Sequence, residues 1–352
     1  MDLQQRINAF VKLGEFLSQF SQNGIQKKDH IKNNEIFFED FQKQIKHSEL
    51  KNGWFTQDNV LFAVENWSKA LYTDNFNHWL KIYDFKEIKP KNIAVIMAGN
   101  IPLVGFHDFL SVLISGHNVI VKQSSNDKQL LPFLANYLIS VEPNFENRIS
   151  FTEDKLQKFD AIIATGSNNT ARYFEYYFKD KPSIIRKNRN SVGIITGNET
   201  EEDLKSLSED IFRYYGLGCR NVSKLFVPKD YNFDSFFNAM YDWNPIIHQT
   251  KYANNYDYNK AVYLMSDFNI LDNGFLMVKE DEGYASPISV VFYEYYDTLD
   301  KLKAKLKQDD ELIQCIVSKN GSESHIPFGK TQKPELWDYA DDVDTIRFLL
   351  KI

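Results

Sequence analysis

The sequence contains little cysteine, and its two cysteines stand far apart. Cys219 and Cys315 are the only ones in 352 residues. They form neither a metal-ligand spacing nor the dense pattern of a disulfide-stapled domain. We therefore expect no metal site and a reducing compartment.

Long apolar runs and an excess of positive charge are also absent. No run approaches the roughly 20 apolar residues that span a bilayer, and the opening MDLQQR shows no secretory pattern. The formal net charge is −7, with acids and bases interspersed, whereas a nucleic-acid partner needs a basic face. We expect a cytoplasmic globular protein without a membrane span or a nucleic-acid partner.

The spacing of apolar residues divides the chain into two textures. Residues 1–88 read as helical, with repeats of three and four in 7–20 and 54–79, and Thr56 or Asp58 can cap the latter stretch. From Asn92, short apolar strands alternate with helical patterns, which predicts a doubly wound α/β sheet followed by a smaller α/β domain. The expected strands are 93–97, 118–122, 161–164, 191–196, 222–227, 289–293 and 314–318. The expected helices are 102–115, 127–141, one from about 168, 200–215 and 233–243.

Two strand ends carry polar side chains suited to a ligand. Asn100 can donate its amide N–H to an oxyanion, or it can bond to its own turn. Lys122, Ser124 and Ser125 can hold a ribose and its phosphate at the end of a strand, or they can be a solvated strand end.

A third strand ends in Thr165, Gly166 and Ser167 directly before a helix. Backbone N–H groups at a helix start attract phosphate, although the same residues also suit a plain N-cap. The three spaced glycines of the dinucleotide-binding fingerprint are absent.

The fourth segment contains Cys219. Gly216 and Gly218 leave its sulfur uncrowded, and Arg220 can lower its pKa and so activate it as a nucleophile. The alternative is a small buried hydrophobic residue. Cys315, among Leu312 and its apolar neighbours, has that second character.

The order of these segments resembles the aldehyde dehydrogenase superfamily, and within it the bacterial acyl-CoA reductases that include the fatty acid reductase of luminescence systems. The resemblance covers roughly residues 90–352. It is carried by the segments 99–103, 116–124, 165–167, 216–227 and 328–345.

The resemblance implies an aldehyde dehydrogenase-like fold with Cys219 as the nucleophile and Asn100 as the oxyanion donor. It implies that Lys122, Ser124, Ser125, Thr165, Gly166, Ser167 and Glu282 bind the cofactor. The expected regions are a helical N-terminal region at 1–88, a nicotinamide cofactor-binding domain at 89–215 and a catalytic domain at 216–325. A fourth expected region is a C-terminal segment at 326–352, which returns to the cofactor domain or makes an oligomer contact.

Three departures from the superfamily pattern refine the expected activity. Arg186 falls near the glutamate that activates water in hydrolytic members, which favours a thiol acceptor over water. Ser125 replaces a glutamate that holds the adenosine ribose of NAD, which permits NADP. The segment that usually contacts the nicotinamide ribose is degenerate, with one residue too many between Glu282 and Pro287.

The resemblance thus implies an NADPH-dependent reduction of a fatty acyl-CoA to an aldehyde, with an S-acyl-cysteine intermediate. NADH is the alternative cofactor, and an acyl-protein thioester is the alternative donor. An acyl-phosphate reductase or acyl transferase on the same fold, and a non-catalytic subunit, stay open. A homo-oligomer is expected.

Overall fold

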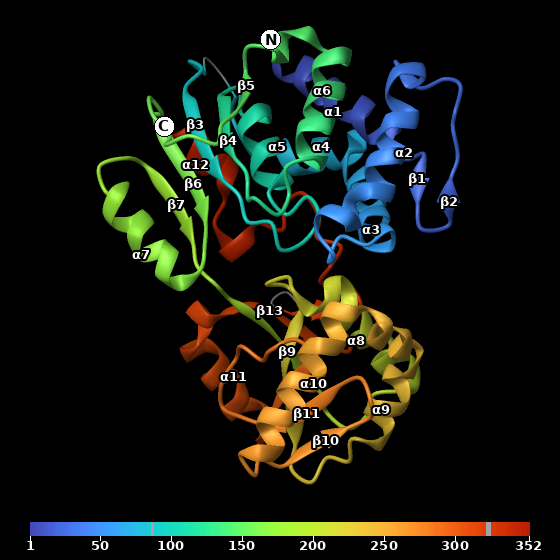
Figure 1. The fold of residues 1–352 in the computed structure, drawn as a ribbon. Helices are drawn as coiled ribbons and strands as arrows, with labels where there is room; N and C mark the ends of the chain where they lie inside the picture. Colours follow the sequence, from blue (N-terminus) through green and yellow to red (C-terminus); the bar gives the residue numbers. More distant parts are fainter. Residues whose placement is uncertain (86–87, 322–324) are drawn as a thin grey trace. The chain divides into compact units, whose positions relative to one another are not determined.

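The computed structural model describes residues 1–85, 88–321 and 325–352 (Figure 1). The chain divides into two compact units. Unit 1 contains residues 1–187 and 335–352, and unit 2 contains residues 188–334. Among the described residues, no helix is both long and apolar enough to cross a bilayer.

Unit 1 is built on a five-stranded sheet in which all neighbours are parallel. Its order is β5-β4-β3-β6-β7, so the strand order reverses between β3 and β6. In open parallel sheets, ligands bind beyond the carboxyl ends of the strands at such a reversal. The strands are β3 (Asn92–Ile96), β4 (Asn118–Lys122), β5 (Ile149–Phe151), β6 (Ala161–Thr165) and β7 (Ser183–Arg186).

Successive residues of a strand point to opposite faces of the sheet, and here both sets are apolar. Helices therefore cover both faces. Ile93 and Val95 join the large core formed with the N-terminal helices, α5 and α6, whereas Ala94 packs in a smaller cluster with Phe174 of α7. The helices are α1 (Leu3–Leu17), α2 (Asn34–Lys51), α3 (Gln57–Ala70), α4 (Thr73–Leu80), α5 (Phe106–Ile114), α6 (Leu130–Val141), α7 (Asn168–Tyr177) and α12 (Thr345–Leu350). A two-stranded hairpin, β1 (Phe20–Ser21) and β2 (Gly24–Ile25), follows α1.

The helical stretch expected over 54–79 is two helices. Thr56 is the N-cap of α3, where its side chain accepts the Asn59 N–H. The helix ends because the Asn75 amide donates to the carbonyls of Lys69 and Ala70, which an uninterrupted helix would use internally.

Unit 2 contains a seven-stranded sheet of order β10-β11-β12-β9-β8-β13-β14. Within the described part of this sheet, the edge strand β10 pairs with β11 in the antiparallel sense and all other neighbours are parallel. The strands are β8 (Asn190–Ile194), β9 (Val222–Pro228), β10 (Ile270–Asp272), β11 (Met277–Glu280), β12 (Val290–Tyr296), β13 (Ile313–Ser318) and β14 (Ile326–Pro327). The helices are α8 (Glu201–Phe212), α9 (Asp234–Met240), α10 (Thr250–Met265) and α11 (Leu299–Gln308).

The two sheets confirm the expected α/β class. The chain enters unit 2 at residue 188, earlier than the expected border after residue 215, because β8 pairs with β9 and β13. Residues 335–352 belong to unit 1. The border expected between 88 and 89 adjoins Lys86 and Glu87, which lie outside the described residues.

A buried carboxylate ties α8 to the end of unit 2. Asp210 is fully buried and accepts the N–H of Gly329 at 2.7 Å and both the N–H and hydroxyl of Thr331 at 3.0 and 2.8 Å. Burial outweighs these bonds and raises the pKa of Asp210 from 3.8 to about 6. The folded state therefore binds this proton more tightly than the unfolded chain does.

The raised pKa of Asp210 predicts the direction in which the free energy of unfolding changes with pH. Stability from the Asp210 site is greatest when the carboxyl is protonated and falls as the pH rises from about 4 to about 6. Relative to Asp210→Asn, the wild-type free energy of unfolding should rise by about 2 kcal/mol between pH 7 and pH 4.5. Denaturant unfolding at several pH values measures it, with exposed Asp257→Asn as the control. A constant difference between wild type and Asp210→Asn across this range would contradict the prediction.

Candidate active site

The segment before Cys219 has an unusual backbone. Helix α8 ends at Phe212, and Tyr214, Tyr215 and Gly216 then adopt left-handed conformations with φ of 56°, 60° and 74°. For a non-glycine residue this costs about 1–2 kcal/mol. Such a conformation persists where surrounding contacts hold it.

The side chain of Asn221 binds this segment at both ends. Its amide N–H groups donate to the carbonyls of Asp210 at 3.0 Å and Arg213 at 2.8 Å, at the end of α8. Its side-chain oxygen accepts the Gly218 N–H at 2.8 Å. One side chain, itself buried, therefore fixes both the helix end and the turn that contains Cys219.

Cys219 lies on the outside of this turn. Its side chain is exposed, and its backbone carbonyl accepts the hydroxyl of buried Ser191 on β8 at 2.9 Å. Strand β9 begins three residues later, at Val222. The turn is thus fastened to α8 on one side and to the sheet on the other, with the sulfur accessible.

Cys315 differs in each of these respects. It lies on β13, the strand next to the edge strand β14, and is only 7% exposed, which confirms the expected core position. Arg220 Nη1 lies 3.5 Å from its sulfur. The activation of Cys219 by Arg220 stays a prediction.

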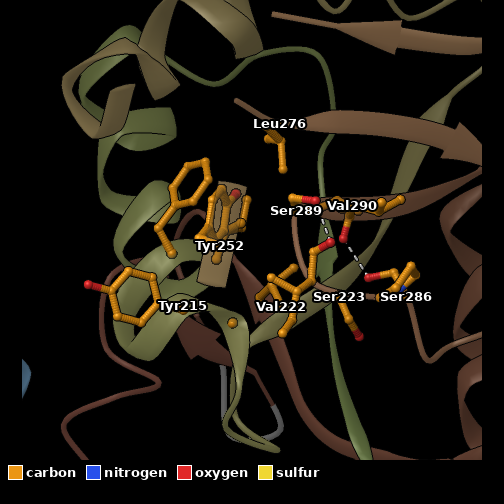
Figure 2. Close-up of a pocket in the computed structure, with 14 residues that line it drawn as sticks. Tyr215, Val222, Ser223, Tyr252, Leu276, Ser286, Ser289 and Val290 are labelled. Atoms are coloured by element: carbon orange, nitrogen blue, oxygen red, sulfur yellow. Dashed lines mark hydrogen bonds between the residues drawn. The ribbon is translucent and has the colours of Figure 1, made fainter. Parts of the chain in front are cut away.

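A small pocket in unit 2 adjoins the Cys219 turn. Its volume is about 30 Å³, and it is lined by residues on both sides of Cys219 in the sequence. Figure 2 shows the rings of Tyr215 and Tyr252 on one side and Val222, Ser223 and Ser286 on the other. Part of its wall is formed by residues 286–291, which begin four residues after Glu282.

The predicted cofactor residues of unit 1 lie at the carboxyl ends of β4 and β6. Lys122 ends β4, and its ammonium donates to the carbonyl of Asp154 at 2.9 Å. Ser124 is partly buried and Ser125 is exposed. A pocket of about 290 Å³ adjoins the Lys122–Asp154 hydrogen bond and is lined by Ile120, Thr152 and residues 154–157.

The Thr165–Ser167 turn starts helix α7. Ser167 is the N-cap, with its hydroxyl accepting the Thr170 N–H at 3.3 Å, so the capping interpretation holds for this side chain. The side chain is exposed, and the first backbone N–H groups of α7 lie at the same edge of the sheet as Lys122. Capping and anion binding use different N–H groups of one helix start.

Asn100 lies in the loop after β3, and a partly buried carboxylate, that of Asp127, holds this loop. Asp127 accepts the backbone N–H of Leu103, and of Gln129 and Leu130 at the start of α6. Leu103 has a left-handed φ of 57°. Burial raises the pKa of Asp127, against the effect of these N–H bonds. Asn100 belongs to unit 1 and Cys219 to unit 2.

Arg186 is engaged in a buried ion pair. At the end of β7 it contacts the carboxylate of Asp108 on α5, and it donates to the Thr345 hydroxyl of α12 at 3.2 Å. Both charged side chains are less than a tenth exposed. A charge pair of this kind fixes the packing of its elements, because separating it would leave a buried charge without compensation.

Solved structures with similar folds identify the class of the fold. The indole-3-acetaldehyde dehydrogenase AldA of P. syringae, solved with NAD+ and IAA, has a TM-score of 0.63 at 12% identity, covering 90% of this chain and 72% of that one. The aldehyde dehydrogenase KauB from Pseudomonas aeruginosa has a TM-score of 0.61 at 12% identity, with 90% and 72% covered. Aldehyde dehydrogenase 21 from Physcomitrella patens has a TM-score of 0.61 at 14% identity, with 90% and 73% covered. The expected aldehyde dehydrogenase-like fold is confirmed.

Sequence comparison identifies the family within that class. The model of the acyl-CoA reductase (LuxC) family matches residues 27–236, and the chain belongs to this family. The long-chain acyl-protein thioester reductase of Aliivibrio fischeri is 24% identical over 229 residues, covering 54% of this chain and 47% of that protein. The match thus spans about half the length of this curated relative.

Some residues of the site escaped sequence reasoning. Asn221, Ser191 and Asp127 act through backbone groups, and only the Gly-Leu-Gly-Cys-Arg-Asn run marked the neighbourhood of one of them. Glu282 is exposed. The catalytic and cofactor-binding roles assigned from the sequence stay predictions.

Proposed function

We propose that this protein reduces an acyl thioester to an aldehyde and that Cys219 is the nucleophile. The observation that carries the proposal is the exposed sulfur on a turn braced by Asn221 and Ser191. Membership of the acyl-CoA reductase family supports the same reaction. A thiol held at a fixed, accessible place is what covalent catalysis at a thioester requires.

The first step is acyl transfer. The Cys219 thiolate attacks the thioester carbonyl carbon, the bond to the coenzyme A sulfur breaks, and that sulfur leaves as a thiolate. The Asn100 amide and the Cys219 backbone N–H are the proposed oxyanion donors, each typically worth about 3 kcal/mol in the transition state. The product is an acyl group on the Cys219 sulfur.

The second step is reduction. When bound, the nicotinamide supplies a hydride to the acyl carbon. The Cys219 sulfur stays attached in the resulting thiohemiacetal anion and then leaves as a thiolate when the C–S bond breaks and the C=O bond of the aldehyde forms. The proton that is consumed goes to the coenzyme A thiolate released in the first step. The balance is one thioester, one hydride and one proton consumed, and one aldehyde and one coenzyme A released.

The cofactor would be held mainly by unit 1. Lys122, Ser124 and Ser125 offer an ammonium and two hydroxyls at the carboxyl end of β4, and the Thr165–Ser167 turn offers backbone N–H groups. This donor set suits the phosphates and ribose of a dinucleotide. Glu282 is the proposed contact for the nicotinamide ribose.

The Arg186–Asp108 pair favours a thiol acceptor over water. Near the position where hydrolytic members of the superfamily carry a base, this chain carries a buried guanidinium paired with a carboxylate. An arginine stays protonated and cannot take a proton from water. The acyl-enzyme would therefore persist until it is reduced or returned to a thiol.

Two finer features belong to this proposal. Ser125 carries no charge to repel a 2′-phosphate, so NADPH is the proposed cofactor. The donor is a fatty acyl-CoA or an acyl group on the thiol of a protein. The second donor has support from the Aliivibrio fischeri relative, whose name describes an acyl-protein thioester reductase.

The acyl-enzyme can be trapped by omitting the nicotinamide. With a radiolabelled acyl-CoA, wild-type protein should retain about one label per chain, and Cys219→Ala should retain none because the bond to sulfur cannot form. The measurement is label remaining after denaturing gel filtration. Cys315→Ala is the matched control and should label like wild type. Label of wild-type extent on Cys219→Ala would rule this nucleophile out.

The cofactor preference can be reversed at Ser125. In Ser125→Glu, the new carboxylate should repel the 2′-phosphate and accept the 2′-hydroxyl of NADH. The KM for NADPH should rise at least about 10-fold while that for NADH falls. Steady-state assays with both cofactors measure this, with Ser125→Ala as the uncharged control. Equal effects of Ser125→Glu on the two cofactors would place residue 125 away from the 2′ position.

A further inference from the structure

A lysine is buried on the strand that follows the Cys219 turn. Lys224 lies on β9, and its side chain is 0% exposed. It points toward the α11 face, where its ammonium lies 5.1 Å from the ring centroid of Phe226 and 4.8 Å from that of Tyr284. A buried ammonium without compensation is costly, and an apolar residue would often stabilise such a position as well or better. The hydrogen-bond partners of the Lys224 ammonium therefore indicate what this lysine does.

Those partners connect three parts of unit 2. The Lys224 ammonium donates to the carboxylate of Glu294 on β12 at 2.7 Å and to the backbone carbonyl of Glu282, also at 2.7 Å. Glu294 contacts a second ammonium, that of Lys305 on α11. The carboxylate thus has two cations, of which Lys224 is the one bonded to the 282–287 segment.

The neighbouring residue of the same strand holds the same segment. The Ser223 hydroxyl donates to the carbonyl of Tyr284 at 2.7 Å. Two successive side chains of β9 thus bind the segment at two backbone carbonyls. The strand that leads away from the Cys219 turn is therefore the strand that fixes the position of Glu282.

We propose that Lys224 is a positioning residue that anchors the 282–287 segment to β9 and so sets the place of the nicotinamide ribose relative to the Cys219 turn. The part concerning the ribose rests on the proposed function. The anchoring of the segment does not. Lys224 touches neither reacting atom, so its loss should impair cofactor binding and hydride transfer more than acyl transfer to Cys219.

The matched pair of variants is Lys224→Met and Lys305→Met. Both remove one ammonium from Glu294, but only Lys224 bonds the 282–287 segment. Hydrogen exchange read by mass spectrometry should show amides of 282–287 exchanging about 10-fold faster in Lys224→Met, and unchanged within two-fold in Lys305→Met. Unchanged exchange of this segment in folded Lys224→Met would overturn the proposal.

NADPH binding and acyl labelling of Cys219 are measured on the same variants. In Lys224→Met, the Kd for NADPH should rise about 10-fold, while labelling of Cys219 by acyl-CoA without nicotinamide stays within two-fold of wild type. Equal losses in labelling and in NADPH affinity would contradict a role in positioning the cofactor segment. A wild-type protein that neither labels nor binds a nicotinamide would refute the proposed function, and the exchange result would still decide the anchor.

A milder variant covers the case in which Lys224→Met does not fold. Ser223→Ala removes the bond to the Tyr284 carbonyl and leaves the buried ammonium in place. It should speed exchange within 282–287 in the same direction by a smaller factor. No change there would count against anchoring by β9.

Discussion

The carboxamide of Asn221 is the interaction on which the proposed chemistry depends. It takes carbonyls that α8 leaves without helical partners, and it binds the Gly218 N–H one residue before Cys219. The left-handed run of Tyr214, Tyr215 and Gly216 lies between the Arg213 carbonyl and the Gly218 N–H that Asn221 binds. The hydrogen bonds of Asn221 offset the cost of the strained turn, which leaves the Cys219 side chain exposed.

Unit 2 uses the same elements for several tasks at once. Helix α8 is held at its end by Asn221 and tied to residues 329–331 by the Asp210 carboxylate. Strand β9 begins at the Cys219 turn and binds the 282–287 segment through Ser223 and Lys224. In unit 1, one side chain also serves two elements, because Asp127 links the Asn100 loop to α6. Asn221, Lys224 and Asp127 each satisfy backbone groups of a loop that carries a proposed functional residue.

The sequence predicted the central parts of the fold better than its edges. Strand β4 has the expected bounds because five residues with Val119 and Val121 inside form a clear pattern, whereas β5 and β7 were missed. Strand β5 is three residues long and largely exposed, so its structure comes from pairing with β4 rather than from its own pattern. The helix expected over 200–215 ends at 212 because Asn221, nine residues further on, takes its carbonyls. The resemblance singled out Cys219, but the residues that hold its turn bond to backbone atoms and leave no sequence pattern.

The most direct test of this account is the rate of coenzyme A release in the first turnover without nicotinamide, compared between wild type and Asn221→Ala. Loss of the brace should let the turn relax, move the sulfur from its place, and slow this release about 100-fold, while the protein still unfolds cooperatively. Release at the wild-type rate from folded Asn221→Ala would show that the turn does not position the nucleophile.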